Sequence, residues 1–132
     1  ARFGPAGDGG RREILRWILF DNHKLTSSTA SLRYLRQFAK NPDEAVAGFH
    51  HARCCSAFAV LDTHLADRNF VLGDTPTIAD LSLCGYLFWP EEFGIPLDDY
   101  PNIGAWLDRI RALPGWVHPY ELMPGHPLPD NP

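Results

Sequence analysis

The chain of 132 residues carries a net charge of −4 and is 45% apolar, which suits a single domain with a real core and excludes wholesale disorder. The acidic balance, with no basic face, argues against nucleic-acid binding, and no apolar run reaches the roughly 20 residues that a membrane span needs. Three cysteines, two of them adjacent, do not form the pattern of a disulfide framework, and we therefore expect a cytoplasmic protein.

The two ends of the chain differ in composition from the middle. Residues 1–10 hold four glycines and a proline, which is typical of a linker, and we expect such a linker to follow an upstream domain. Residues 123–132 hold four prolines and a glycine, which predicts an extended tail. The sequence thus predicts one domain over residues 11–123, between a linker at 1–10 and a proline-rich tail at 124–132.

Residues 11–39 have the apolar periodicity of a long helix. Its middle, residues 26–29, is a polar stretch of poor helix formers, and we expect a kink or a solvated face there. A second helix is predicted to begin at an Asn41 cap, with Pro42 in the first helical position, and to run to about Ala66. The apolar stripe that we expect this helix to bury consists of Val46, Phe49, Ala57, Val60, Leu61 and Leu65.

The next helix has the clearest start signal in the chain. Thr77 and Asp80 have the spacing of a capping box, in which each side chain accepts a hydrogen bond from the other residue's backbone N–H. We expect a mostly buried helix from Thr77 to Trp89, ended by Pro90. Asp80 can also be interpreted as a catalytic carboxylate, but the capping pattern favours a structural role. On that interpretation, Asp80→Ala costs about 0.5–2 kcal/mol of stability rather than changing specificity.

The last long helix is predicted to open at Tyr100-Pro101-Asn102, to carry Trp106 on its apolar face, and to stop at Pro114-Gly115. A further short turn is expected between Trp116 and Leu122. No segment shows the alternating pattern of a strand, so the predicted fold class is an all-α helical bundle.

Three motifs of this chain resemble the C-terminal helical domain of bacterial cytosolic glutathione S-transferases. They are Gly73-Asp74-Thr75-Pro76-Thr77-Ile78-Ala79-Asp80, Tyr100-Pro101-Asn102-Ile103 with Trp106, and Arg16-Trp17 with the polar stretch that follows. The resemblance implies an N-terminal thioredoxin-like domain, absent from this chain, that binds most of the glutathione and carries the residue that activates its sulfur. The parent would be a detoxification enzyme that conjugates glutathione to electrophiles or uses it as a reductant. The chain alone would hold no catalytic residue and be inactive.

The resemblance also implies site residues and partners. In the family, the first helix of this domain lines the cleft between the domains, and the chain's tail often closes the co-substrate pocket. The candidate binding residues are Asn22, His23, Thr26 and Ser27 for the cleft and Trp116 and Tyr120 for the pocket. Solvated polar residues on the first helix are the alternative. The family pairs across its first two helices, so we expect a homodimer, and an isolated helical domain should self-associate through its exposed apolar interface.

Two other functions are compatible with the sequence. Transferase-like helical domains also serve as stand-alone modules for protein–protein interaction without catalysis. The pairs His50/Cys54 and His51/Cys55 each have the i, i+4 spacing of two zinc or copper ligands on one helix. The two pairs point about 100° apart and no second ligand pair accompanies them, so we expect no metal.

Overall fold

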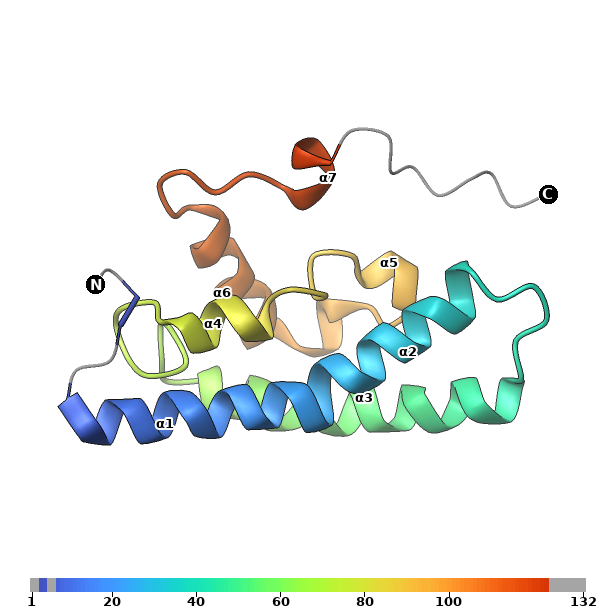
Figure 1. Ribbon diagram of the computed structural model, residues 1–132, viewed down its shortest axis with the longest axis horizontal. Coiled ribbons are helices and arrows are strands. Elements are labelled where there is room, and N and C mark those ends of the chain that lie inside the picture. The colour runs from blue at the N-terminus through green and yellow to red at the C-terminus, as the bar shows by residue number, and fades with distance from the viewer. Residues whose placement is uncertain (1–2, 5–6, 124–132) are drawn as a thin grey trace.

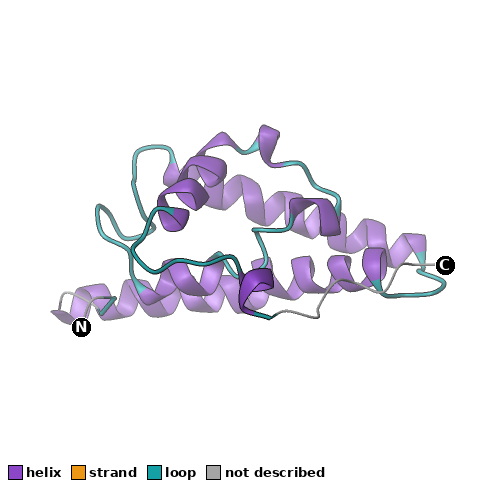
Figure 2. Cartoon of the chain, turned by 90° about the horizontal axis from the view of Figure 1, so that it is seen from above, coloured by secondary structure: helices purple, strands orange, loops and turns teal. Residues whose placement is uncertain are grey.

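The computed structural model describes residues 3–4 and 7–123, and the regular elements of this part of the chain are all helices, which confirms the predicted all-α bundle (Figures 1 and 2). In chain order they are α1 (Gly7–Phe20), the π-helix η1 (Asp21–Leu25), α2 (Thr26–Gln37), α3 (Glu44–Leu65), α4 (Ile78–Leu83), α5 (Pro90–Phe93), the 3₁₀-helix η2 (Leu97–Asp99), α6 (Pro101–Arg111) and α7 (Pro119–Leu122). Figure 1 shows α1, η1 and α2 as one bent rod beside α3, with α4, α5 and α6 above them and α7 above that layer. None of these helices is long and apolar enough to cross a membrane.

The rod begins earlier than the sequence predicted. Helix α1 starts at Gly7, inside the segment expected to be a linker, because helix propagates outward from the packed turns at Ile14 and Trp17. Asp8 in the first turn also interacts favourably with the positive end of the helix. The predicted tail at 124–132 lies outside the described residues.

A π-helical turn at Asp21–Leu25 interrupts the rod immediately before the polar stretch where we expected a kink. The solvated face predicted for residues 26–29 is wrong in part, since Ser28 and Thr29 are only 1% and 0% exposed. Thr29 can be buried because its hydroxyl donates to the Leu25 carbonyl at 2.9 Å. The buried Asp21 carboxylate accepts from the hydroxyls of Thr26 and Ser82, which ties the π-helical turn to α4.

Helix α3 is capped by Asp43 rather than by Asn41. The Asp43 carboxylate accepts from the backbone N–H groups of Ala45 and Val46 at 2.8 and 3.2 Å, and α3 ends at Leu65, close to the predicted boundary. Half of the predicted apolar stripe is wrong: Ala57, Leu61 and Leu65 are buried, whereas Val46, Phe49 and Val60 are 43%, 58% and 52% exposed. Helix α3 is apolar on more than one side, so periodicity alone does not identify which side faces the core.

The predicted capping box is present at the start of α4, but the helix ends at Leu83 and not at Trp89. Leu87, Phe88 and Trp89 are all at most 7% exposed. Three consecutive residues on a helix would point about 100° apart, so turns replace the helix and let all three face inward. Pro90 therefore begins α5 instead of ending α4.

Helix α6 opens at Pro101, as the Tyr100-Pro101-Asn102 motif predicted, and is capped from a distance by Asp62 of α3. The Asp62 carboxylate accepts from the backbone N–H groups of Asn102 and Ile103 at 2.8 and 3.0 Å and from the Asn102 amide at 2.9 Å. Trp106 on this helix is fully buried. The Asp62 contacts join α3 to α6 in the upper layer.

Candidate functional site

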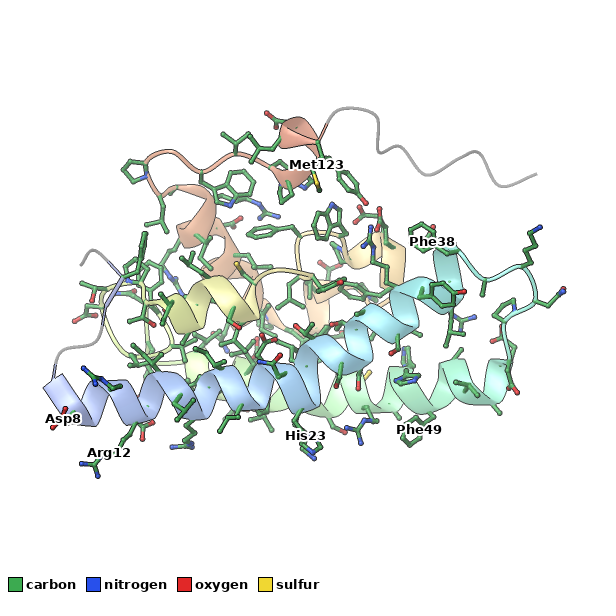
Figure 3. All side chains as sticks on the ribbon, in the orientation of Figure 1. Asp8, Arg12, His23, Phe38, Phe49 and Met123 are labelled. Carbon is green, nitrogen blue, oxygen red and sulfur yellow. The ribbon has the colours of Figure 1, made fainter. Side chains whose placement is uncertain are left out.

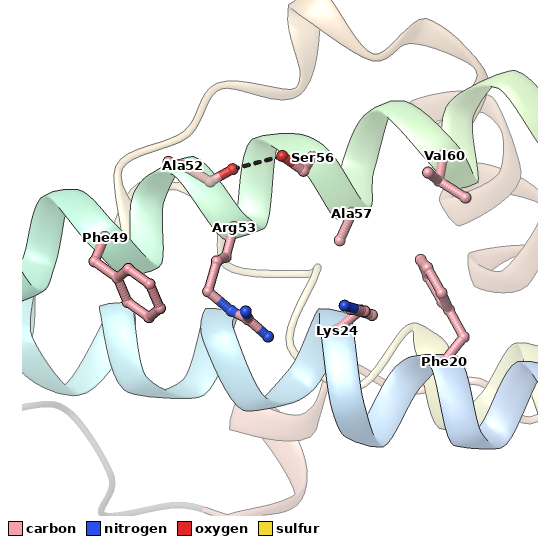
Figure 4. A pocket seen from close by; sticks show the side chains of 8 residues that line it. All are labelled: Phe20, Lys24, Phe49, Ala52, Arg53, Ser56, Ala57 and Val60. Atoms are coloured by element: carbon pink, nitrogen blue, oxygen red, sulfur yellow. Dashed lines mark hydrogen bonds between the residues drawn. The ribbon is translucent and has the colours of Figure 1, made fainter.

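A groove runs between the bent rod and α3 on the outer face of the molecule, away from the α4–α6 layer (Figure 4). It has a cavity volume of about 480 Å³. The residues that line this α1–α3 groove are Phe20, Lys24, Phe49, Ala52, Arg53, Ser56, Ala57 and Val60. A second hollow on the same seam is lined by Arg16, Trp17, Ala59, Val60, Thr63 and His64.

The α1–α3 groove combines apolar walls with positive charge. The Arg53 guanidinium donates to the Ser28 hydroxyl at 3.2 Å and to the His23 carbonyl at 3.3 Å, and lies 5.5 Å from the centroid of the exposed Phe49 ring. Lys24 supplies a second cation, and the lining includes no carboxylate. A surface of this composition suits contact with another protein better than exposure to water.

The four cleft candidates, Asn22, His23, Thr26 and Ser27, lie on η1 and the first turn of α2. Most of their side-chain polar hydrogens already donate hydrogen bonds to neighbouring groups of this segment. Asn22 donates one amide hydrogen to the Ile18 carbonyl at 2.9 Å, and Ser27 donates its hydroxyl to the His23 carbonyl at 2.9 Å. Thr26 donates to the Asp21 carboxylate. Figure 3 shows the exposed His23 side chain pointing away from the α4–α6 layer.

The two pocket candidates, Trp116 and Tyr120, lie near the C-terminal end of the described residues, in a cluster separate from the four cleft candidates. Trp116 packs against Phe88 with ring centroids 5.3 Å apart. The Tyr120 hydroxyl donates to the Glu92 carboxylate at 2.5 Å and accepts from the Arg33 guanidinium at 2.8 Å. Arg33 and Glu92 were not predicted as site residues, because they lie far apart in the chain and belong to no sequence motif.

Arg33 and Glu92 form a mostly buried ion pair, with side chains 17% and 9% exposed. The Arg33 guanidinium lies 5.2–5.8 Å from the ring centroids of Phe38, Tyr86 and Trp89, so cation–π contacts add to the pair. Burial alone would lower the pKa of Arg33, but its hydrogen bond with Glu92 and the Glu92 charge outweigh burial and raise that pKa. The Arg33 guanidinium therefore stays protonated at any physiological pH.

Tyr120 is equally held in its neutral form. Burial, with the hydrogen bond that the hydroxyl donates to Glu92, raises the pKa of Tyr120 above its ordinary value of 10.0, although Arg33 acts in the opposite direction. Tyr120, Arg33 and Glu92 thus link α7, α2 and α5 through one polar cluster.

Asp80 lies too deep for a catalytic role. The residue is 0% exposed, and its carboxylate accepts from the backbone N–H groups of Val71 and Thr77 at 2.8 and 2.7 Å, from the Thr77 hydroxyl, and from the Trp106 indole at 3.0 Å. All four donors are protein groups that position the loop, α4 and α6. The geometry supports the structural interpretation of Asp80.

The cysteine–histidine segment of α3 brings only one of its two pairs into contact. The Cys55 sulfur lies 3.7 Å from Nδ1 of His51, whereas Cys54 is fully buried. Burial raises the pKa of Cys54 and that of Cys84 to about 12, so these thiols do not offer thiolates at neutral pH. Across residues 3–4 and 7–123, no group of three or more His, Cys, Asp or Glu side chains is arranged to hold a metal ion.

The arrangement of helices matches a known domain. The family model described as glutathione S-transferase, C-terminal domain, matches residues 24–114. Glutathione S-transferase GST-4.5 of Xanthomonas campestris is 31% identical over an alignment of 119 residues, and the match covers 83% of this chain and 56% of the relative. Glutathione S-transferase verG of Clonostachys rogersoniana is 32% identical over an alignment of 116 residues, and the match covers 82% of this chain and 48% of the relative. The chain therefore spans about half the length of these relatives.

A solved structure gives the same result in three dimensions. The glutathione S-transferase of Xanthobacter autotrophicus Py2 superimposes with a TM-score of 0.82 at 32% sequence identity. The match covers 87% of this chain and 57% of that chain.

Proposed function

The chain belongs to the glutathione S-transferase family, as its C-terminal domain, and from that premise we propose that it is the co-substrate-binding half of a glutathione transferase. The match of the family model over residues 24–114 is the observation that carries the proposal. The parent would conjugate glutathione to electrophiles or use it as a reductant, as a detoxification enzyme of the cytoplasm. A stand-alone interaction module is not favoured, because the relatives above are named as transferases.

In this proposal the chain provides walls and hydrogen-bond donors, and the domain outside it activates the sulfur. Glutathione reacts as a thiolate, whose formation needs donors or positive charge near the sulfur. The hydroxyl hydrogens of Thr26 and Ser27 are already committed to Asp21 and to the His23 carbonyl. Asn22 retains one amide hydrogen and His23 keeps its ring N–H, so these two residues are the better donors to glutathione, or to a water at its sulfur.

We expect His23→Ala in the two-domain parent to lower kcat/KM for glutathione conjugation by about 10- to 100-fold, the value of one hydrogen bond to a charged group. Steady-state kinetics with purified parent would measure it. His51→Ala on α3 is the matched control and should stay within about twofold of the parent value. Equal effects of both substitutions would contradict the assignment of His23. A folded parent that neither binds immobilised glutathione nor conjugates it would contradict the proposed function itself.

We also propose that the parent is a homodimer that pairs across the outer face of α1 and α3. The groove on this face is lined by Phe49 and Val60, whose side chains are 58% and 52% exposed, and α1 exposes Leu15 and Leu19 at 55% and 60%. Two copies related by a twofold axis would bury these side chains and the α1–α3 groove together.

We expect Phe49→Asp to weaken this dimer at least about 100-fold, because it removes a large apolar ring from the proposed contact and puts there a carboxylate that both copies would have to bury. Light scattering coupled to gel filtration, over about 1–100 µM chain, would measure the change. Leu122→Asp alters a side chain that is 67% exposed but lies on α7, and it should leave the dimer intact. A Phe49→Asp variant that dimerises like the unsubstituted chain would show that another surface pairs.

A further inference from the structure

Helix α3 carries one thiol that the core does not enclose. Cys54 and Cys84 are buried, and burial raises the pKa of each of these thiols to about 12. Cys55 is only partly buried. Because the reactive form of cysteine is a thiolate that a reagent can reach, Cys55 is the thiol of this chain that is suited to chemistry.

Cys55 lies on the side of α3 that faces the start of α6. Asp62 is seven positions further along α3, which is two helical turns, and its carboxylate accepts from the backbone N–H groups of Asn102 and Ile103 at 2.8 and 3.0 Å. Phe49 points away from the α4–α6 layer in Figure 3 and lies about 120° around the helix from Cys55. Cys55 is therefore outside the dimer contact proposed for the α1–α3 groove.

Two side chains contact the Cys55 thiol on this side of α3. Nδ1 of His51, one turn earlier on the helix, lies 3.7 Å from the Cys55 sulfur, and the His51 ring is exposed. When the ring carries its own proton on Nε2, Nδ1 accepts the thiol proton. The second contact is the Tyr100 hydroxyl, just before α6. Burial and the hydrogen bond with Cys55 raise the pKa of Tyr100 to about 12, so this hydroxyl stays a donor at neutral pH.

We propose that Cys55, His51 and Tyr100 form a thiol-exchange site that reacts with a small disulfide. His51 accepts the Cys55 proton, Tyr100 donates to the thiolate, and the thiolate attacks one sulfur of the disulfide. The S–S bond of the small disulfide breaks as a bond forms between Cys55 Sγ and the attacked sulfur. The departing thiolate takes the proton from His51, so the products are a mixed disulfide at Cys55 and one free small thiol.

The charges beside the site favour a cationic disulfide. The carboxylates of Asp99 and Asp62 act on Tyr100 by charge, and the chain as a whole has a net charge of −4. A disulfide with ammonium groups, such as cystamine, is therefore attracted, whereas glutathione disulfide, which is an anion, is repelled. The inference does not rest on the proposed function, because it needs neither glutathione nor an upstream domain.

The base is tested by treating the chain with cystamine at pH 7 and measuring mixed-disulfide formation by intact-mass spectrometry and peptide mapping. We expect the adduct on Cys55, and we expect His51→Ala to form it at least about fivefold more slowly. This deficit should fall below about twofold at pH 10, where an ordinary thiol ionises without a base. His50→Ala replaces the neighbouring histidine of α3 and is the matched control, which should stay within about twofold at both pH values.

Two further measurements test the donor and the charge preference. Tyr100→Phe keeps the ring that packs against Phe58 and removes the hydroxyl, and it should slow the reaction at least about threefold at pH 7. Glutathione disulfide should react at least about threefold more slowly than cystamine, after each rate is divided by the rate of the same disulfide with mercaptoethanol. This difference should shrink at high salt.

The outcomes that overturn the site are distinct from those that bear on the transferase. An adduct on Cys54 or Cys84, an unchanged rate in His51→Ala, or a His51→Ala deficit that persists at pH 10 would overturn the thiol-exchange site. A corrected rate with glutathione disulfide that equals or exceeds the rate with cystamine would overturn the preference for cations. None of these measurements involves conjugation, so an inactive parent would overturn the proposed function and leave this site standing.

Discussion

Replacing Asp80 with alanine is expected to lower the free energy of unfolding by about 3–5 kcal/mol, several times the cost of losing a single helix cap. The carboxylate is fully buried and accepts from Val71, Thr77 and Trp106, which belong to the loop, to the α4 cap and to α6. Its removal leaves these buried donors without acceptors. For a domain of this size, the melting temperature should fall by about 10–20 °C, measured by thermal and urea unfolding.

Two further variants separate the contributions to this loss. Asp74→Ala changes an exposed aspartate of the same loop and should cost less than about 1 kcal/mol. In a double-mutant cycle, Asp80→Ala and Trp106→Phe should couple by about 1–2 kcal/mol, because both remove the same indole hydrogen bond. If Asp80→Ala costs no more than 0.5–2 kcal/mol, the ordinary cost of a cap, the contacts with Val71 and Trp106 contribute no stability.

The sequence predicted the local part of this arrangement and missed the distant part. The Thr77–Asp80 capping box depends on residues three apart, and such spacing is visible in any sequence. The contact from Asp80 to Trp106 spans 26 positions, and nothing in the local pattern indicates it. The same holds for Asp62, which caps α6 from α3 across 40 positions. Long-range hydrogen bonds follow from packing and cannot be derived from helix periodicity.

The helices themselves were predictable where one face is apolar and ambiguous where apolar residues surround the helix. In α6, Ile103, Trp106 and Leu107 are buried, as the steps of three and four predict. In α3 the same reasoning assigned Phe49 and Val60 to the core, yet both lie on the outer face. Those exposed side chains are what we propose to pair in the dimer, so the error in the core prediction falls on a candidate functional surface.

The candidate site was predicted only in part, because its residues come from distant segments. Asn22 and His23 are neighbours in the sequence and lie together on η1, so a motif can identify them. The cluster around Tyr120 is different. Arg33 and Glu92 are 59 positions apart in the sequence, and Tyr120 is 87 positions from Arg33 and 28 from Glu92. Only a folded chain brings one arginine, one glutamate and one tyrosine into contact.

Breaking this cluster at Arg33 is the second large effect that we expect. Arg33→Met should lower the free energy of unfolding by about 3–5 kcal/mol at pH 7, because it leaves the Glu92 carboxylate, only 9% exposed, buried without a cation. The charge pair on the surface provides the control: Arg36 lies 3.0 Å from Glu44, with side chains 38% and 68% exposed. Arg36→Met should therefore cost less than about 1 kcal/mol.

A double variant distinguishes a lost charge partner from lost packing. Arg33→Met combined with Glu92→Gln should recover most of the stability at pH 7, because the amide oxygen still accepts from Tyr120 and no buried charge remains. If the double variant is as unstable as Arg33→Met alone, the guanidinium stabilises the domain through its contacts with Phe38, Tyr86 and Trp89 and not through Glu92.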